Sequence, residues 1–294
     1  MFHRFTLFQQ HSVQTVSTID ALLRPRAINL AMVEFEQMGD ATVRQWSWQS
    51  EVAANDLLKH SVGALLHPMR EQGELDYTMQ TSATPIPEIK LAVFDMDSTL
   101  IQAEVMDELA YAAGIGPKVA AITASAMAGE IDFTQSFEQR LALLEGFDID
   151  QLDAIYHTIE LMPGAEKLMQ QLQAKGIYCA ILSGGFSYFA DRLAQRLGMQ
   201  QAFSNPLEQH EGKLTGQISV PILDANQKVT LLEQLRTELG LSMGQCLAVG
   251  DGANDLPMLN SAGLGVAFHA KLLVKQQAPQ QISHFDLDVL ACLV

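Results

Sequence analysis

The stretch Leu91-Ala92-Val93-Phe94-Asp95-Met96-Asp97-Ser98-Thr99-Leu100 decides the fold of this chain. Its four leading apolar residues are typical of a strand that is buried on both faces of a parallel sheet. Open α/β sheets carry their chemistry in the crevice beyond the carboxyl ends of the strands, and there Asp95 and Asp97 follow. Two carboxylates this close repel each other, so a site that holds both ionised favours a bound cation.

A carboxylate that can attack beside a hard cation suits phosphoryl transfer through an aspartyl intermediate. On its own, the stretch is equally consistent with an acidic turn after a core strand. A calcium loop fits less well, because Thr99 and Leu100 stand where an EF-hand needs a third oxygen ligand and then a glycine. The ends of the later strands therefore decide between a phosphoryl-transfer site and a plain turn.

The composition is that of an ordinary globular chain. Its 294 residues, 48% of them hydrophobic, suit two domains or one large domain with a small one attached. The formal net charge of −16 disfavours nucleic acid and anionic membranes as partners. The three cysteines are scattered, and neither a signal peptide nor a transmembrane segment is apparent. We expect a cytoplasmic protein, and the sequence leaves open whether it is a monomer or a homodimer.

Residues 1–84 are predicted to form a small α+β domain, apart from a larger domain at 85–294. No nucleophile, metal cluster or glycine loop is evident in it. A helix is expected over Val52–Met69, ended by Pro68, and a linker over Thr81–Pro87. Strands are expected over Phe5–Phe8, Asn29–Glu36 and Thr42–Trp48.

Residues 104–160 are predicted to be helical, with glycine-containing breaks and no strand. A helical insertion after the first strand predicts a cap over the sheet edge. Within it, Arg140 lies seven residues after Phe133, on nearly the same helix face. A guanidinium on the apolar face either meets an anion beneath the cap or extends its charged end to solvent.

The alternation of helices and strands resumes after the insertion. A strand at Ile177–Leu182 ends in Ser183-Gly184-Gly185, which offers a hydroxyl and bare N–H groups to an anion. Lys228, near the start of a helix over Ala225–Leu239, opposes the helix dipole unless an anion lies nearby. Further helices are expected at Gly164–Lys175, Phe186–Leu197 and Phe285–Leu293. Phe203–Leu207 and Gly216–Val220 are expected to pair as a hairpin. Further strands are expected at Cys246–Val249 and Leu264–Phe268.

Three predicted strands thus end, in order, in Asp-x-Asp-x-Thr, Ser-Gly-Gly and Gly-Asp-Gly-x-Asn-Asp, with an isolated lysine before the last. Over residues 89 to about 270 this pattern resembles the haloacid dehalogenase superfamily of phosphohydrolases. The resemblance implies an α/β fold with a Rossmann-like core, a parallel sheet and a helical cap. It matches the superfamily's motifs to Asp95, Asp97 and Thr99; to Ser183 and Gly184; to Lys228; and to Asp251, Asn254 and Asp255.

The resemblance also implies roles for these residues. Asp95 would be the nucleophile, and Asp97 would act as general acid and then as general base. Mg²⁺ would be held by the Asp95 carboxylate, the Asp97 backbone carbonyl and Asp251, with Asp255 ordering its waters. The phosphate oxygens would be bound by Ser183, Lys228, Asn254 and backbone amides such as that of Gly184.

Fewer residues bear on the substrate. The chain is most similar to the phosphoserine branch of the superfamily, in which Glu104 would hold the substrate ammonium and Arg140 its carboxylate. Met127 and Phe133 would form an apolar lining. The resemblance thus implies a Mg²⁺-dependent hydrolase of O-phospho-L-serine, acting in the last step of serine biosynthesis.

Two other functions stay open. One is a phosphatase or phosphotransferase for another small phosphate ester, because the motifs do not separate water from an alcohol as acceptor. The other is a non-catalytic amino-acid sensor, against which the intact Asp95 and Asp97 argue. Residues 1–84 occupy the place of the regulatory, ACT-like domain of longer relatives, but show no ligand-binding motif.

Overall fold

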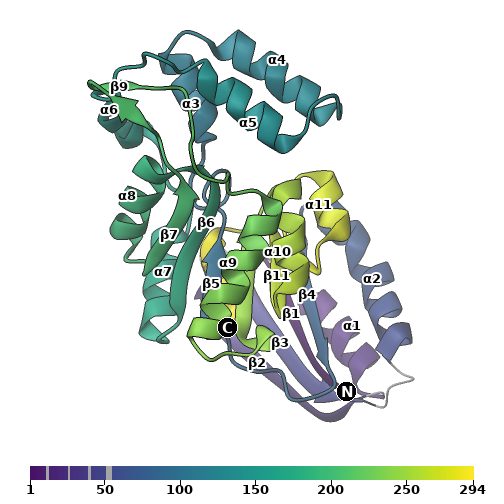
Figure 1. Ribbon diagram of the computed structural model, residues 1–294. Helices are drawn as coiled ribbons and strands as arrows, with labels where there is room; N and C mark the ends of the chain where they lie inside the picture. Colours follow the sequence, from purple (N-terminus) through teal and green to yellow (C-terminus); the bar gives the residue numbers. More distant parts are fainter. Residues whose placement is uncertain (11–12, 26, 39–40, 51–54) are drawn as a thin grey trace.

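A six-stranded parallel sheet forms the centre of the molecule (Figure 1). The computed structural model describes residues 1–10, 13–25, 27–38, 41–50 and 55–294. The strand order is β12-β11-β10-β5-β6-β7. The strands are β5 (Leu91–Phe94), β6 (Tyr178–Phe186), β7 (Gln201–Asn205), β10 (Cys246–Gly250), β11 (Leu264–Phe268) and β12 (Gln280–Ile282).

Helices cover both faces of this sheet, which explains the uninterrupted apolar runs of its strands. Ala92 and Phe94 of β5 face α7 (Ala165–Ala174) and α8 (Ser187–Leu197). The alternate residues, Leu91 and Val93, face the other helices of the alternation. Those helices are α9 (Ala225–Glu238), α10 (Leu256–Ser261) and α11 (Leu272–Gln277). The predicted α/β class with a parallel sheet is confirmed.

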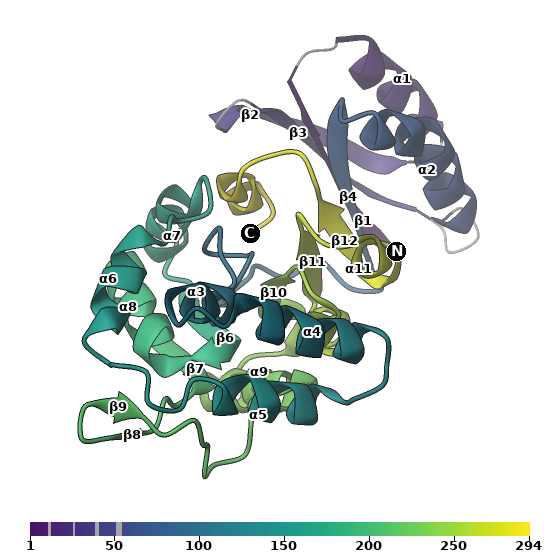
Figure 2. The same ribbon diagram turned by 90° about the horizontal axis from the view of Figure 1, so that it is seen from above.

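The predicted helical insertion is also confirmed, and it lies over the carboxyl ends of the strands (Figures 1 and 2). Its helices are α3 (Val105–Ala112), α4 (Gly116–Met127), α5 (Phe133–Ala142) and α6 (Gln151–Thr158). A small hairpin of β8 (Gln209–His210) and β9 (Lys213–Leu214) joins this layer through a bridge between Asp148 and Lys213.

The hairpin predicted between Phe203–Leu207 and Gly216–Val220 is wrong. Residues 201–205 instead form β7, which pairs in parallel with β6 at the edge of the main sheet. The hairpin that forms is shorter and turns at Glu211-Gly212, where both residues have positive φ. The turn was visible in the sequence, but the distant pairing partner of β7 was not.

The N-terminal part forms an antiparallel sheet in the order β2-β3-β1-β4. Its strands are β1 (Phe2–Gln9), β2 (Ile28–Met38), β3 (Ala41–Gln49) and β4 (Leu75–Ser82), and its helices are α1 (Val13–Leu23) and α2 (Asn55–Glu71). Three strand predictions here are confirmed, whereas α1 and β4 were not predicted. Pro68 does not end α2, which continues to Glu71 because a proline in the last turn disrupts few hydrogen bonds. The predicted helix start at Val52 lies outside the described residues.

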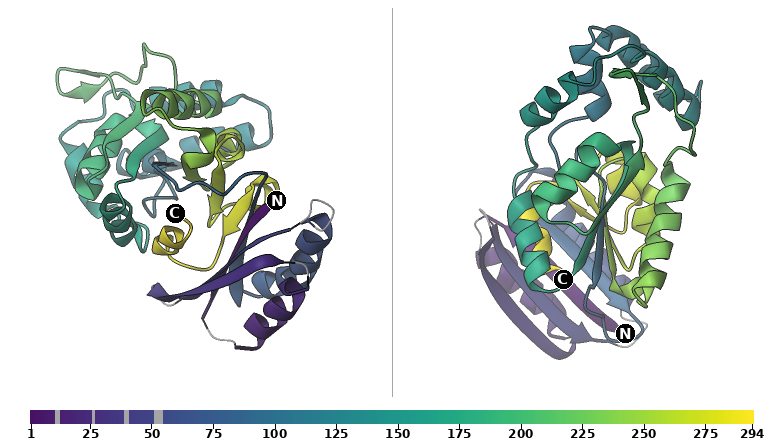
Figure 3. Two further views of the ribbon diagram at one scale, coloured as in Figure 1. Left: turned by 90° about the horizontal axis from the view of Figure 1, so that it is seen from below. Right: turned by 60° about the vertical axis from the view of Figure 1, so that its left-hand side comes forward.

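The antiparallel sheet packs against the part of the chain that contains the parallel sheet, on the side opposite the cap (Figure 3). Phe8, Ala41 and Val43 share one apolar cluster with Phe285 and Leu287. The predicted closing helix at Phe285–Leu293 is a shorter 3₁₀ helix over Leu287–Cys292, buried between this sheet and α7. Strand β4 includes the first two residues of the predicted linker. A division into domains at residue 84 stays a prediction.

Among the described residues, no helix is both long enough and apolar enough to span a membrane.

Candidate active site

The first strand end places Asp95 at the centre of a group of charged side chains. Asp95 follows β5 directly, is 5% exposed, and its backbone N–H bonds Val249 O of the neighbouring strand β10 at 2.9 Å. Its Oδ1 accepts the N–H of Met96 at 2.8 Å. The carboxylate is therefore held at a fixed orientation at the carboxyl edge of the sheet.

Lys228 reaches this group from the first turn of α9. It is fully buried, and its Nζ lies 2.8 Å from Asp95 Oδ1 and 2.6 Å from Asp255 Oδ1. Burial alone would lower the pKa of Lys228, but the charges of Asp255 and Asp95 outweigh burial and raise it. The anion that its unfavourable helix position predicted is thus present as two carboxylates.

Asp251 and Asp255 complete an acidic cluster after β10. One carboxylate oxygen from each of Asp95, Asp251 and Asp255 lies within 4.8 Å of the other two. Burial raises the pKa of Asp251 to about 7, and the nearby acids add to the shift. Burial likewise raises the pKa of Asp255, whereas the charge of Lys228 lowers it.

Three buried carboxylates share one lysine, so Lys228 alone does not balance the negative charge that the cluster carries when all three are ionised. A hard divalent cation would balance it, since oxygen ligands at this spacing suit such an ion. The donor set of the described residues therefore fits a magnesium-type site.

The second strand end lies beside Asp97. Asp97 Oδ1 accepts the N–H of Val105 at 3.3 Å. Its pKa is raised well above the ordinary value by burial first and then by Glu104 and Asp95. Ser183 is fully buried, and its hydroxyl accepts the N–H of Gly185 at 2.9 Å. The site thus contains two different carboxyl groups. The raised pKa of Asp97 favours its protonated form, whereas Asp95 is paired with Lys228.

Gly185 allows these two strand ends to approach. A Cβ atom there would lie 2.9 Å from Asp97 Oδ2, closer than side chains tolerate. We expect Gly185→Ala to displace Asp97 and lower kcat/KM roughly 10- to 100-fold with the fold retained. Steady-state kinetics and circular dichroism check this. Gly116→Ala is the matched control, because a Cβ there meets nothing within 4 Å; equal kinetics for both variants would contradict the prediction.

The cap brings further predicted residues over the site. Glu104 begins α3 and accepts a hydrogen bond from Ser98 Oγ at 2.8 Å, while desolvation raises its pKa. Phe133 begins α5, and its ring edge lies 3.4 Å from the point that a Cβ atom would occupy if Gly184 had one. Met127 ends α4, but its side chain lies outside the described residues.

Arg140 lies within electrostatic range of two acids of the cap. Its Nε donates to Ser136 O of its own helix at 3.2 Å. Burial lowers the pKa of Arg140, and the charges of Asp107 and Glu104 act in the opposite direction. Arg140 and Glu104 therefore lie within electrostatic reach of each other, and a zwitterion could bind between opposite charges of this kind.

Two supporting residues were not predicted from the sequence. Asn205, 1% exposed at the end of β7, donates from Nδ2 to Gly184 O and accepts the N–H of Leu223, both at 2.8 Å. It thereby fixes the glycine turn after β6. Ser98 orients Glu104 in the same way. Neither residue has a local signal, because each acts through a partner that only the fold brings near. Asn254, of the fourth motif, is half-buried in the same loop as Asp251.

The chain belongs to the haloacid dehalogenase-like hydrolase family. The sequence model of that family matches residues 89–263. The phosphoserine phosphatase of Archaeoglobus fulgidus is 43% identical over 242 residues, which cover 81% of this chain and 70% of that protein.

Two solved structures are similar along nearly the whole chain. One is a haloacid dehalogenase family hydrolase of Salmonella enterica serovar Typhi, with a TM-score of 0.85, 29% identity and coverage of 98% of this chain and 97% of the other. The second is a probable phosphoserine phosphatase of Vibrio cholerae, with a TM-score of 0.75, 32% identity and coverage of 99% and 85%.

Proposed function

We propose that this protein hydrolyses O-phospho-L-serine to L-serine and phosphate through an aspartyl-phosphate intermediate. The observation that carries the proposal is the convergence of Asp95, Asp97 and Lys228 at one sheet edge beneath a cap that holds Glu104 and Arg140. The relatives named phosphoserine phosphatase support the substrate.

In the first half-reaction, a carboxylate oxygen of Asp95 attacks phosphorus, and the bond from phosphorus to the seryl oxygen breaks. Asp97 gives its proton to the leaving seryl oxygen. Its pKa, raised by burial and by the charges of Glu104 and Asp95, suits this role, because these effects favour the protonated acid form. In the second half-reaction, Asp97 takes a proton from water, the water oxygen bonds to phosphorus, and Asp95 is released.

The remaining residues hold the phosphoryl group. Lys228, fixed between Asp95 and Asp255, spreads positive charge over the equatorial oxygens. Ser183, the N–H of Gly184 and Asn254 would donate hydrogen bonds to the same oxygens. The anion-binding groups thus come from two strand ends, those of β6 and β10, and from the start of α9.

The Asp95 carboxylate, the Asp97 carbonyl and Asp251 would hold Mg²⁺. When bound, the ion reduces the repulsion between phosphate and nucleophile. Asp255 would lie behind these ligands, because Lys228 and the N–H of Gly252 already bind its two oxygens at 2.6 and 3.0 Å.

The cap residues would select the substrate. Glu104 takes the ammonium and Arg140 the carboxylate, while Phe133 and Met127 form the apolar lining. The ring of Phe133 is held by a tilted contact with Phe137, which in turn contacts Phe186 of β6. These aromatic contacts link the cap to the sheet beside Gly184.

Release of phosphate from O-phospho-L-serine tests the function. We expect it to require Mg²⁺, to stop in excess chelator and to return when Mg²⁺ is restored. Ca²⁺ should inhibit, because its higher coordination number lets Asp95 bind through both oxygens. Full activity in chelator would contradict the metal assignment. Phosphorus NMR with added alcohols separates hydrolysis from transfer, the alternative function.

The metal dependence should vary with pH. Because the pKa of Asp251 without metal is about 7, a proton must leave when the ion binds at lower pH. The apparent affinity for Mg²⁺ should therefore be roughly tenfold weaker at pH 6 than at pH 8.

Without metal, pH acts on folding stability in the opposite direction: a higher pH makes the folded protein less stable. Folding raises this pKa above its ordinary 3.8, so Asp251 contributes less stability as the pH rises from there to about 7. Thermal unfolding with and without Mg²⁺ measures both effects, and a Mg²⁺-induced rise in Tm that is equal at pH 6 and pH 8 would count against this account.

A cytoplasmic location, the lack of nucleic-acid and membrane partners, and a regulatory role for residues 1–84 stay predictions, and the oligomeric state stays open.

A further inference from the structure

Asn205 lies where the pairing between two strands of the parallel sheet is interrupted. Strands β6 and β7 pair at Leu182 with Phe203 and again at Phe186 with Asn205, so residues 183–185 of β6 stand opposite a single residue of β7. Those three residues are the Ser-Gly-Gly turn, to which the proposed function assigns the phosphate. An irregularity of this kind leaves backbone groups of the longer segment without partners in the ladder, and they need others.

The side chain of Asn205 supplies one of these partners. It is 1% exposed, and its Nδ2 donates to Gly184 O at 2.8 Å. At the other end of the same peptide group, the N–H of Gly185 donates to the Ser183 hydroxyl at 2.9 Å. The peptide is therefore fixed at both ends, although its glycines would otherwise let it rotate. Because the Ser183 hydroxyl accepts a hydrogen bond there, its own proton stays available for a phosphate oxygen.

The other polar atom of the Asn205 amide holds the segment that leads into α9. Its Oδ1 accepts the N–H of Leu223 at 2.8 Å, and the next residue, Asp224, is the N-cap of α9. The Asp224 side chain accepts the N–H of Gln227, and Lys228 follows directly. A planar amide donates and accepts from fixed positions. One side chain thus joins the Ser-Gly-Gly turn to the helix that presents Lys228.

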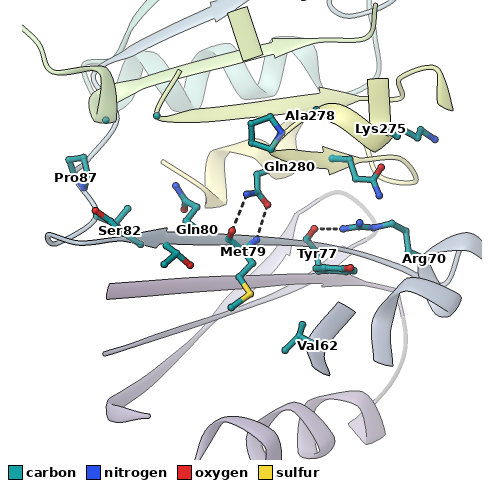
Figure 4. A pocket seen from close by; sticks show the side chains of 16 residues that line it. Val62, Arg70, Tyr77, Met79, Gln80, Ser82, Pro87, Lys275, Ala278 and Gln280 are labelled. Atoms are coloured by element: carbon teal, nitrogen blue, oxygen red, sulfur yellow. Dashed lines mark hydrogen bonds between the residues drawn. The ribbon is translucent and has the colours of Figure 1, made fainter. Parts of the chain in front are cut away.

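The same kind of bridge occurs at the opposite edge of the parallel sheet. There the side-chain amide of Gln280 donates to Met79 O at 3.0 Å and accepts the N–H of Met79 at 2.8 Å (Figure 4). It joins β12 to β4 of the N-terminal sheet, and none of the residues proposed for the phosphoryl group lines the cavity beside it. Each amide therefore makes one donated and one accepted bond to backbone, and Gln280 is a matched control for Asn205.

We propose that Asn205 is a positioning residue for phosphoryl transfer. It holds the Ser-Gly-Gly turn and the start of α9 at the separation that the equatorial oxygens of the phosphoryl group require. It acts through Gly184 and Leu223 and not by contact with the substrate. This inference rests on the proposed function and extends it to a residue outside the sequence motifs. Because both elements serve the phosphoryl group and neither serves the serine part, Asn205 affects all phosphate esters alike, unlike Arg140.

The test compares Asn205→Leu with Gln280→Met in the full-length protein. Each variant replaces an amide by an apolar side chain of similar shape and removes both bonds to backbone. We expect Asn205→Leu to lower kcat/KM roughly 10- to 100-fold, by the same factor for O-phospho-L-serine and for p-nitrophenyl phosphate. Gln280→Met should leave both values unchanged.

Two binding measurements separate positioning from a general loosening of the site. Orthovanadate resembles the phosphoryl group during transfer, so its affinity, measured by calorimetry with Mg²⁺ present, should fall together with kcat/KM in Asn205→Leu. The affinity for Mg²⁺ alone should stay unchanged, because Asn205 bonds neither Asp95 nor Asp251. Asn205→Ala, which removes the same bonds without adding apolar bulk, should give the same pattern.

The proposal is overturned by unchanged kinetics in the Asn205 variants, by equal losses in Gln280→Met, or by a loss for phosphoserine alone. Equal losses of Mg²⁺ and orthovanadate affinity would also overturn it. If circular dichroism shows that both Asn205 variants lose the fold, the residue serves folding and the assignment is wrong. A wild-type protein that hydrolyses p-nitrophenyl phosphate but not O-phospho-L-serine would contradict the proposed substrate only, and Asn205 is then judged on the aryl ester and orthovanadate.

Discussion

Asp95→Asn is expected to reduce phosphoserine turnover by roughly 10⁴-fold or more, the scale seen when a covalent nucleophile is removed. An amide oxygen attacks phosphorus far less readily than a carboxylate. The change is nearly isosteric, and Lys228 keeps Asp255 as its partner at 2.6 Å, so no unpaired buried charge remains. Single-turnover kinetics measure the loss, and trapping of the phosphorylated protein shows whether the intermediate forms.

The control for this variant is Asp191→Asn, an exposed carboxyl group on α8 that is not part of the acidic cluster. Both variants should keep the fold, as judged by circular dichroism and thermal unfolding. If Asp95→Asn forms a phosphorylated intermediate at the normal rate, the nucleophile is another residue and the mechanism is wrong.

The second large effect is expected at Arg140. Arg140→Ala should lower kcat/KM for O-phospho-L-serine by roughly 30- to 1000-fold, corresponding to about 2–4 kcal/mol for a charge-assisted contact in a closed site. An aryl phosphate lacks the carboxylate, so its kcat/KM should change little. Arg140→Lys should restore only part of the loss, because lysine cannot form the bidentate pair.

Gln139→Ala, on the exposed side of the same helix, controls for damage to α5. Equal losses of both substrates in Arg140→Ala would mean that Arg140 holds the cap through Glu104 and Asp107 and does not read the substrate. That distinction matters, because Arg140 donates to Ser136 O of its own helix and the charges of Asp107 and Glu104 act on it.

The gathering of charged side chains at the sheet edge was predictable because its signals are local. Each functional residue of the core directly follows an apolar run or a helix start, and the edge of a parallel sheet then brings the strand ends together. Lys228 is the clearest example, since its unfavourable place in the first turn of α9 indicated an anion, and the structure places two carboxylates there.

Features that depend on distant partners were not predictable in this way. Strand β7 was assigned to a hairpin because its pairing with β6 is set by the whole sheet. Asn205 was overlooked because its two partners, Gly184 and Leu223, are 21 and 18 residues away along the chain. Strand β4 was read partly as linker, although Asp76 and Met79 anchor it to the catalytic part.

The substrate preference of the wild-type protein tests the central claim most directly. It is measured as kcat/KM with Mg²⁺ for O-phospho-L-serine, for phosphoethanolamine, which lacks only the carboxylate, and for glycerol phosphate, which lacks both charged groups. The account predicts that phosphoserine exceeds phosphoethanolamine at least about 30-fold, the value of one charge-assisted contact, and glycerol phosphate by more. Equal values for the three esters, or a preference for either of the others, would contradict it.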